Sequence, residues 1–348
     1  MTTLLGNPDF LTNLKGKSAT FMLALSNTHT AQIEGITQAG IPGLIHLTPT
    51  LDAEFLCTGE VKSLENIAET PKGVPTPALL TRAVHLLHPF KEITLLDLGL
   101  DSIPKVENAP IYGFGIKPSD RIDHAAKINA NAVFNAGLRF GEEYQPNSDY
   151  LIIGESTPSG TTTAQATALA LGYDAKDKFS SSFKNVPNDI KAQTIDKALK
   201  FIHPSDSVLD KASKVGDNML IFTAGFVMGA SEKGYPLILA GGTQMAAVLL
   251  LINRLSAKFS YPNLALCTTK WVAQDAHSDI KALLEMLDFP LNAYAADFDF
   301  ALSNHPALKL YDQGEAKEGV GAGAALVYGL LNDLTKEQIT QQVEGFLG

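Results

Sequence analysis

The feature that most constrains this chain is the alternation of short apolar runs with longer amphipathic runs along nearly its whole length. Short apolar runs bounded by turn residues are typical of buried strands, and apolar residues spaced three and four apart are typical of helices. Because strands and helices alternate, the order predicts a mainly parallel, doubly wound sheet of the Rossmann-like α/β class. The predicted strands are Thr20–Leu25, Gly43–Leu47, Glu92–Asp97, Tyr150–Ile153, Leu237–Ala240, Leu264–Cys267 and Asn292–Ala295.

The predicted helices lie between these strands, and glycines follow some of them where a left-handed residue ends a helix. They span Ala31–Gln38, Pro77–Leu87, Asp120–Glu143, Thr162–Leu171, Asp189–Lys200, Asp217–Lys233, Gln244–Lys258 and Ser278–Leu287. The segment from Gly321 to Phe346 predicts two further helices that pack back on the body. We therefore expect one large α/β domain, with its core at about 75–320, and a smaller helical part built from the N-terminal region and about 321–348.

Composition narrows the choice of partners and of compartment. The chain carries 37 acidic and 27 basic residues, a formal net charge of −10, which argues against nucleic acid or an anionic membrane as a partner. Its apolar runs are shorter than the ~20 residues that span a bilayer, and its first residues do not resemble a signal peptide. Cys57 and Cys267 are far apart and in no CxxC arrangement. We expect two buried thiols in a cytoplasmic protein.

A run of small and hydroxyl-bearing residues follows the fourth predicted strand, from Gly154 to Thr163. Ligands of such sheets bind beyond the carboxyl ends of the strands, and a helix N-terminus offers free N–H groups to a phosphate. No Lys follows Gly160 and no GxGxxG is present, so the run is neither a Walker loop nor a dinucleotide fingerprint. A plain turn capped by Thr161 is the alternative. The candidate phosphate ligands here are Gly154, Ser159, Gly160, Thr161 and Thr162.

Two further features accompany this loop. Glu155 would repel a phosphate unless it has another role, and accepting hydrogen bonds from ribose hydroxyls would be such a role. The strand Leu237–Ala240 leads into Gly241, Gly242 and Thr243 before the next helix, which repeats the strand, glycine and helix arrangement. Phosphate binding and an ordinary tight turn are equally compatible with that second segment.

A third glycine segment contains the candidate base. Glu318 precedes Gly319, Gly321 and a strongly apolar helix. A carboxylate withdrawn from water has a raised pKa, which makes it a better general base near neutral pH. The alternative is a first-turn glutamate that is favoured by the helix dipole.

Together these segments resemble the nicotinate-nucleotide–dimethylbenzimidazole phosphoribosyltransferase family, in its divergent archaeal and cyanobacterial branch. The family's GEMGxxNTT loop is similar to Gly154–Thr162, and its GEGxGAA signature is similar to Lys317–Ala322. Its VVDVGV strand resembles Leu96–Leu100, and its KVRPGT turn resembles Gly115–Ser119. The family's DGF is Ala240-Gly241-Gly242 here, so an acidic group is missing.

The resemblance implies transfer of ribose 5-phosphate from nicotinate mononucleotide to a flat heteroaromatic base. The product would be an α-riboside 5′-phosphate for assembly of the cobalamin lower ligand. It implies that Glu318 is the catalytic base, that Glu155 and the glycine segments bind the nucleotide, and that Lys191 lies near its phosphate. The acceptor pocket would draw partly on Val74–Leu79. The family implies a homodimer and requires no metal and no further cofactor.

Other functions stay open at this point. A nucleotide-binding protein of the same fold without turnover would keep the loops but has no need of Glu318. Adenine or a phenol could replace dimethylbenzimidazole as the acceptor. A nicotinamide-dependent oxidoreductase is disfavoured because no GxGxxG follows a strand. His85 and His88 share a helix face, but no carboxylate follows at a spacing useful for a metal.

Overall fold

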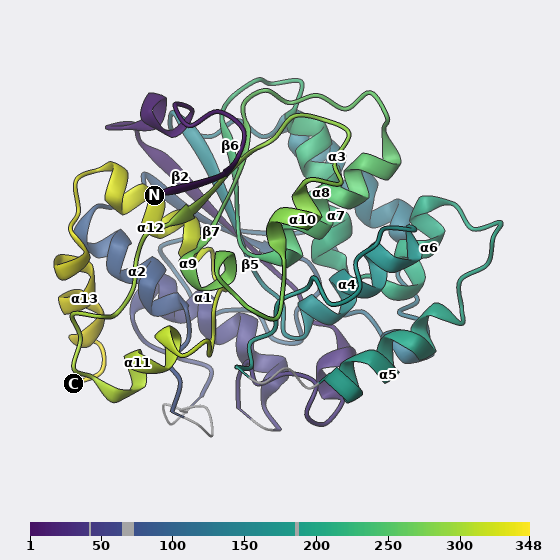
Figure 1. The fold of residues 1–348 in the computed structure, drawn as a ribbon, viewed down its shortest axis with the longest axis horizontal. Coiled ribbons are helices and arrows are strands. Elements are labelled where there is room, and N and C mark those ends of the chain that lie inside the picture. Colours follow the sequence, from purple (N-terminus) through teal and green to yellow (C-terminus); the bar gives the residue numbers. More distant parts are fainter. Residues whose placement is uncertain (42, 65–72, 185–187) are drawn as a thin grey trace.

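The computed structural model describes residues 1–41, 43–64, 73–184 and 188–348 (Figure 1). Within these ranges the strands form one mainly parallel sheet in the order β1-β8-β7-β6-β5-β2-β3-β4, and β1 is an antiparallel edge strand. The predicted α/β class is confirmed. The strands are β1 (Thr2–Leu5), β2 (Ala19–Leu25), β3 (Glu92–Asp97), β4 (Ile111–Gly113), β5 (Tyr150–Ser156), β6 (Leu237–Ala240), β7 (Leu264–Thr269) and β8 (Asn292–Ala296).

Side chains of the central strands alternate between two hydrophobic cores, as the pleat of a strand requires. In β2, Phe21 and Leu23 belong to one core, whereas Met22 and Ala24 belong to the other. These four side chains are fully buried, which explains why the strand is apolar on both faces.

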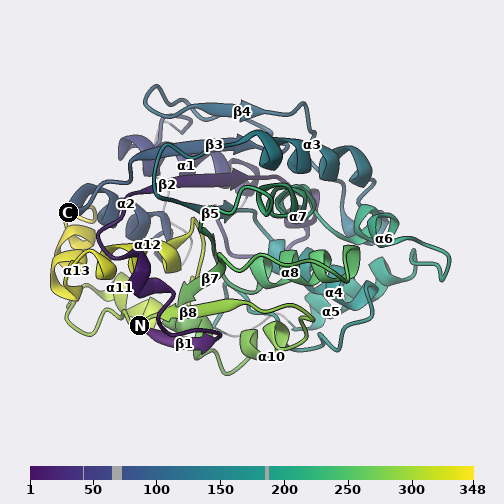
Figure 2. The ribbon, with the colours of Figure 1, turned by 90° about the horizontal axis from the view of Figure 1, so that it is seen from above.

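Helices cover both faces of the sheet, and Figure 2 shows the two groups on opposite sides of it. One group comprises α1 (Thr48–Thr58), α2 (Ala78–Leu87), α11 (Pro306–Asp312), α12 (Ala322–Leu331) and α13 (Lys336–Glu344). The other comprises α3 (Ala130–Glu143), α4 (Gly160–Ala170), α5 (Asn188–Leu199), α6 (Val208–Val215), α7 (Asn218–Ala230), α8 (Thr243–Leu255) and α10 (Ile280–Leu284). The short helix α9 (Lys270–Ala273) follows β7.

The helices α3 and α7 approach each other unusually closely through glycines. A Cβ atom added to Gly137 would come within 3.0 Å of the Phe222 carbonyl oxygen, and one added to Gly225 would come equally close to the Phe134 carbonyl oxygen. Gly141 and Gly229 make the same kind of approach one turn further on. The backbones themselves are therefore in contact, and these positions have no room for a side chain.

Three predicted elements are wrong or too long. Gly43–Leu47 is not a strand, because Ile45–Leu47 forms a 3-10 turn that leads directly into α1. The predicted helix Ala31–Gln38 is only a 3-10 turn over His29–Gln32, and Gly35 then takes a positive φ of 76°. The helix predicted over Asp120–Glu143 begins at Ala130, because Asn129 caps it and the residues before it include left-handed ones.

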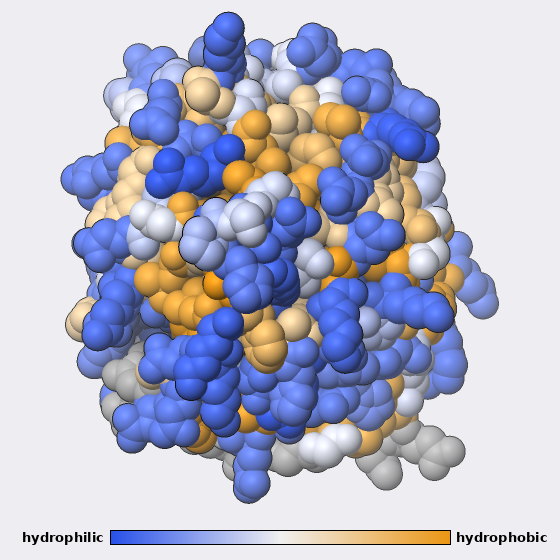
Figure 3. All heavy atoms as spheres, turned by 90° about the vertical axis from the view of Figure 1, so that its right-hand side faces the viewer, coloured by the Kyte–Doolittle hydropathy of each residue, from blue (hydrophilic) through white to orange (hydrophobic). Residues whose placement is uncertain are grey.

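Elements at the ends of the chain complete the body. The two helices predicted after Gly321 are present as α12 and α13, and α12 packs against β6, β7 and β8. The division into a large domain and a smaller helical part stays a prediction. No helix in the described ranges is long and apolar enough to cross a membrane. Figure 3 shows hydrophobic patches separated by hydrophilic side chains on the side where α5 and α6 lie in Figure 1.

Candidate active site

The site lies where the sheet changes winding direction. The chain leaves β2 toward β3 and β4 on one side, and β5 to β8 are added on the other side, so β2 and β5 border the switch point. Ligands of open α/β sheets bind in the crevice at this point, beyond the carboxyl ends of the strands. The helix after β2 reaches the end of β5, because Ser156 Oγ donates a hydrogen bond to Asp52 Oδ2 at 2.7 Å.

The structure brings the three predicted glycine segments together at this edge. A Cβ atom on Gly154 would lie 3.0 Å from the Gly321 Cα atom, so β5 and the segment before α12 touch through their backbones. The Val320 N–H donates to the Glu155 carbonyl oxygen at 2.8 Å. A Cβ atom on Gly242 would lie 3.7 Å from the Glu318 Cβ atom. The end of β5 and the loop after β6 therefore both border the segment that carries Glu318.

The Glu318 carboxylate is held by donors from two segments. Its Oε1 accepts from the N–H groups of Gly319 and Gly323, each at 3.1 Å, and its Oε2 accepts from the Thr269 N–H at 3.0 Å. The Thr268 hydroxyl also donates to Oε2, at 3.3 Å. Burial raises the pKa of Glu318 to about 7, although these hydrogen bonds act in the opposite direction.

One of these hydrogen bonds can give way to a ligand. A carboxylate has about four lone-pair positions, so the four donors occupy its accepting capacity. The Thr268 hydroxyl makes the longest of the four bonds and its O–H can rotate away, which would free an acceptor site on Oε2. Glu318 as a whole residue is partly exposed, so the segment that carries it borders the solvent.

Glu155 lies at the end of β5 in an acidic surrounding. Its Oε1 accepts a hydrogen bond from Gln244 Nε2 at 3.2 Å, and its side chain is buried. Burial, followed by the nearby charges of Glu318, Asp217 and Asp52, raises the pKa of Glu155 to about 8. Burial likewise raises the pKa of Asp52 and of Asp217 to about 6 each. Such a concentration of buried carboxylates favours a ligand that brings positive charge or hydroxyl donors.

These shifted carboxylates predict a pH-dependent stability. The pKa of Glu155 is about 8 in the folded chain and about 4.3 in an unfolded one, so the folded state binds more protons between these values. The free energy of unfolding therefore falls as pH rises from about 5 to about 8. We expect Glu155→Gln to make the decline of the melting temperature over this range shallower, as measured by calorimetry in a series of buffers. An unchanged slope, equal to that of the exposed control Glu232→Gln, would contradict the buried position of Glu155.

The N-terminus of α4 holds buried polar atoms next to Gln244, which also contacts Glu155. Ser159 stands at the N-cap with a left-handed φ of 59° and makes no side-chain capping bond. Among the described residues, Ser159 Oγ, Thr157 Oγ1 and Gln244 Oε1 are buried without a hydrogen-bond partner. Buried polar groups are normally paired, so unpaired ones gathered at a helix N-terminus indicate a place for a ligand. Gly160 belongs here too, because a Cβ atom on it would overlap the Gln244 side chain.

The remaining predicted phosphate ligands are placed differently. Thr162 is buried in the first turn of α4, and Thr161 is partly exposed beside it. The Thr243 hydroxyl accepts a hydrogen bond from the Ser180 N–H at 3.2 Å, so a segment of chain lies over the start of α8. Lys191 lies on α5, and its ammonium donates to the Ser180 carbonyl oxygen at 3.4 Å.

Lys191 also lines a polar cavity. The cavity has a volume of about 410 Å³ and lies between α4, α5 and the segment after α9. Its lining residues are Gln165, Asp177, Phe179, Lys191, Ala276, His277, Ser278 and Asp279. Burial, followed by the neighbouring charge of Lys317, lowers the pKa of Lys191 to about 7.

Sequence reasoning missed several residues of this site. Asp52 lies on a helix that was not predicted, and Asp217 caps α7, where its Oδ1 accepts from the Leu220 N–H at 2.9 Å. Gln244 directly follows Thr243, a predicted phosphate ligand. This position was the one feature of the sequence that could have indicated Gln244 as a site residue. The segment Val74–Leu79 reaches the site, because a Cβ atom on Gly319 would lie 3.4 Å from Pro77. Within the described ranges, no group of three His, Cys, Asp or Glu side chains could hold a metal ion.

The chain is similar in sequence to several known proteins. A family model described as phosphoribosyltransferase matches residues 96–268. A UPF0284 protein of Sulfurisphaera tokodaii is 39% identical over 327 residues, which cover 93% of this chain and 91% of that protein. The UPF0284 protein of Sulfolobus acidocaldarius is 36% identical over 345 residues, which cover 97% of this chain and 98% of that protein.

Solved structures share the fold at lower identity. The nicotinate-nucleotide-dimethylbenzimidazole phosphoribosyltransferase of Thermus thermophilus matches with a TM-score of 0.60 and 18% identity, over 95% of this chain and 83% of that one. A structure of CobT from the same organism matches with a TM-score of 0.60 and 20% identity, over 95% and 84% of the two chains. At 18% and 20% identity, these two matches show that the fold is shared.

Proposed function

This chain belongs to the nicotinate-nucleotide–dimethylbenzimidazole phosphoribosyltransferase family, together with the archaeal UPF0284 proteins, and on that basis we propose its reaction. It moves ribose 5-phosphate from nicotinate mononucleotide to a flat heteroaromatic base such as dimethylbenzimidazole. The products are free nicotinate and an α-riboside 5′-phosphate, a precursor of the cobalamin lower ligand. The proposal includes the expectation that the protein is a homodimer and is located in the cytoplasm.

The observation that carries the proposal is the position of Glu318. Its carboxylate is anchored by backbone N–H groups, its Cβ atom borders Gly242, and its charge acts on Glu155 at the end of β5. With a pKa of about 7 it is about half ionised at neutral pH, and its ionised form is basic enough to take a proton from an azole N–H.

The bond changes follow from this arrangement. A ring nitrogen of the acceptor attacks the anomeric carbon from the face opposite nicotinate, and the bond from that carbon to the pyridine nitrogen breaks. The electron pair of the broken bond returns to the pyridine ring, so nicotinate leaves without a positive charge on nitrogen. The acceptor N–H proton passes to Glu318. Holding donor and acceptor in line supplies a large part of the barrier reduction, because it replaces a chance encounter by a fixed geometry.

Other residues bind the donor. Glu155 and Gln244 lie where they can hold the ribose hydroxyls, and Ser159 at the start of α4 faces the 5′-phosphate. The acidic surrounding of Glu155 favours a donor whose ring nitrogen is positively charged and a reacting ribose that becomes positive. The Val74–Leu79 segment beside Gly319 contributes to the acceptor pocket.

The unpaired Ser159 hydroxyl gives a prediction that separates binding from stability. Leaving a buried hydroxyl without a partner costs about 1–3 kcal/mol, so Ser159→Ala should leave the free energy of unfolding unchanged or raise it. The same change removes a donor to the phosphate and should weaken nicotinate mononucleotide binding about tenfold. Calorimetric titration together with urea unfolding checks both parts. A variant that is destabilised by more than about 1 kcal/mol while it binds normally would show that Ser159 serves the fold instead.

The proposal is tested first by donor binding and then by the choice of acceptor. Nicotinate mononucleotide should bind more tightly than nicotinate riboside, which lacks the phosphate, and titration of both ligands measures the difference. Dimethylbenzimidazole, adenine and a phenol are then offered separately, and nicotinate release is followed for each. Equal affinity for both donors would remove the phosphate site from the proposal. Release with adenine or a phenol alone would keep the reaction and change the acceptor.

A further inference from the structure

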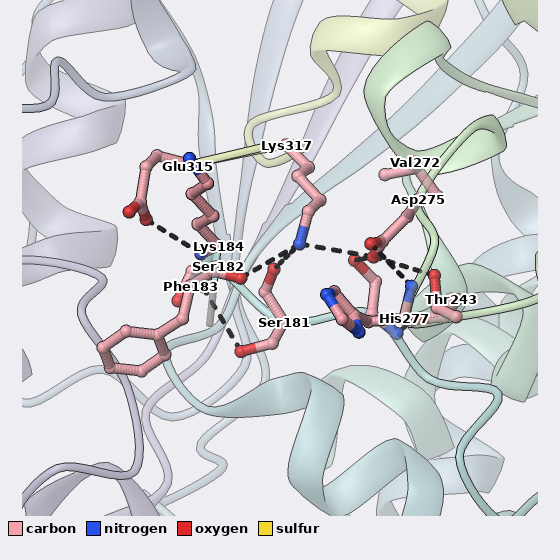
Figure 4. Close-up of polar contacts among 12 residues, drawn as sticks. Ser181, Ser182, Phe183, Lys184, Thr243, Val272, Asp275, His277, Glu315 and Lys317 are labelled. Atoms are coloured by element: carbon pink, nitrogen blue, oxygen red, sulfur yellow. Dashed lines mark hydrogen bonds and ion pairs between the residues drawn. The ribbon is translucent and has the colours of Figure 1, made fainter. Parts of the chain in front are cut away.

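A buried ion pair lies directly before the proposed base. Lys317 Nζ and Asp275 Oδ2 are 3.3 Å apart, and their side chains are only 4% and 3% exposed. The same ammonium donates to the carbonyl oxygens of Ser181 at 2.9 Å and of Phe183 at 3.0 Å. Figure 4 shows the Lys317 side chain reaching between these carbonyls and Asp275. A buried ion pair is costly to form and is a weak source of net stability, so its presence here calls for a role in fixing the geometry.

Both carbonyl groups that accept from the Lys317 ammonium belong to segment 180–184, whereas Asp275 also accepts from the His277 N–H and the Ser278 hydroxyl of its own segment. Asp275 Oδ2 also accepts from the Ser180 hydroxyl at 3.1 Å. The Ala316 N–H donates to the Ser182 carbonyl oxygen at 3.0 Å, and the Lys184 N–H donates to Glu315 Oε2 at 3.0 Å. Segment 180–184 is therefore held on both sides, by the residues before Glu318 and by the residue two positions after α9.

The same stretch of β7 anchors both Lys317 and Glu318. The Thr269 hydroxyl donates to the Lys317 carbonyl oxygen, while the Thr269 N–H donates to Glu318 Oε2 at 3.0 Å. Lys317 thus connects segment 180–184 to the backbone position that sets the proposed base.

Segment 180–184 in turn holds Lys191. The Ser180 carbonyl oxygen accepts from the Lys191 ammonium, and the next carbonyl along the chain accepts from Lys317. The Ser180 N–H donates a hydrogen bond to the Thr243 hydroxyl at the start of α8. One short segment therefore places an ammonium group, a helix N-terminus and the segment that carries the base in a fixed relation.

We propose that Lys317 and Asp275 are positioning residues for the transferase reaction, because they fix segment 180–184 so that Lys191 faces the phosphate of the donor. The proposal rests on the function proposed above and adds to it a pair of residues with a stated task. Neither side chain touches the reacting atoms. The pair acts by holding the phosphate-binding side of the site at a set distance from Glu318.

The charges around Lys191 give the proposal a signature in pH. Lys317 faces it from the segment before Glu318, Asp275 from the segment after α9, and Asp177 from the segment after α4, while His277 and Asp279 line the same cavity. The charge of Lys317 lowers the pKa of Lys191, so removal of that charge raises it again. Since a protonated Lys191 binds phosphate, the loss of donor affinity at alkaline pH should then begin at a higher pH.

Three variants of the full chain test the proposal. Lys317→Met removes the ammonium, and Lys317→Met combined with Asp275→Asn removes both charges in case the single change leaves Asp275 unpaired and the chain unfolded. Lys214→Met is the matched control, because Lys214 pairs with Asp206 at 2.7 Å outside the site. Hydrogen exchange of segment 180–184 is measured without ligand, and nicotinate mononucleotide binding is titrated from pH 6 to pH 9.

The expected result has two parts. In Lys317→Met or in the double variant, the amides of Ser180 and Lys184 exchange at least about tenfold faster, whereas in Lys214→Met they exchange as in the unchanged protein. Donor affinity falls at least about tenfold, and in Lys317→Met its alkaline decline moves to higher pH. If the donor affinity fell by the same factor at every pH, the segment would be loosened without any change in the pKa of Lys191, which is contrary to the proposal.

Three outcomes would overturn the proposal. They are unchanged exchange in segment 180–184, faster exchange with unchanged donor affinity, and an alkaline decline that does not move. A protein that binds nicotinate mononucleotide in the expected manner but releases no nicotinate with any acceptor would leave the positioning role standing and contradict the proposed reaction.

Discussion

Replacement of Glu318 by glutamine is expected to lower kcat/KM for phosphoribosyl transfer by about 10²–10⁴, the range that general bases contribute. Glutamine has nearly the same size but cannot take the acceptor proton. In the unchanged protein the Thr269 N–H donates to the Glu318 carboxylate. The glutamine NH2 group at that place is itself a donor and cannot accept this bond, so some loss of stability accompanies the loss of activity. Steady-state release of nicotinate measures the effect, and titration with nicotinate mononucleotide shows whether the donor still binds.

The pH profile gives an independent check on the same residue. The base must be ionised, so log kcat/KM should rise with pH and level off above the pKa of Glu318, which is about 7. In Glu318→Gln this limb should disappear. A variant with at least half of the original activity, or with the same acid limb, would exclude Glu318 as the base.

Replacement of Gly225 by alanine is expected to destabilise the protein by about 3 kcal/mol or more, at the upper end of the range for overpacked cores. The added Cβ atom would come within 3.0 Å of the Phe134 carbonyl oxygen, and a backbone atom cannot swing aside as a side chain can. The α3 and α7 helices would have to separate, which would disturb contacts along their whole interface. Urea unfolding of the purified variant measures the change.

Gly113 provides the matched control for this effect. It has no atom within 4 Å of an added Cβ atom and no left-handed backbone, so Gly113→Ala should change the free energy of unfolding by less than about 0.5 kcal/mol. If Gly225→Ala were as mild as the control, the two helices would not be in backbone contact.

The sheet was predictable because burial on both faces makes a strand apolar throughout. Tyr150–Ile153 and Leu237–Ala240 carry this signal, and both belong to central strands in the structure. The edge strand Thr2–Leu5 lacks it, since its pairing depends on Asn292–Ala296 at the other end of the chain. Gly43–Leu47 was predicted as a strand and is not one, because a short apolar run can also occur just before a helix.

The site was predictable where a local motif marked it. Gly154, Glu155 and Glu318 stand in glycine segments that adjoin strand or helix ends, and the structure brings these segments together. Asp52 carries no local mark, because it meets Ser156 across 104 residues of sequence. Lys317 likewise depends on Asp275, and only the folded chain shows that both are buried.

The central claim is that this chain exchanges nicotinate for another base on ribose 5-phosphate. The most direct measurement incubates the purified protein with nicotinate mononucleotide and dimethylbenzimidazole and quantifies both products by mass spectrometry. The account predicts free nicotinate and the α-riboside 5′-phosphate of dimethylbenzimidazole in equal amounts, and formation of both at least about 100-fold slower with Glu318→Gln. Tight binding of the nucleotide with no release of nicotinate, whichever acceptor base is supplied, would contradict the account and identify a nucleotide-binding protein.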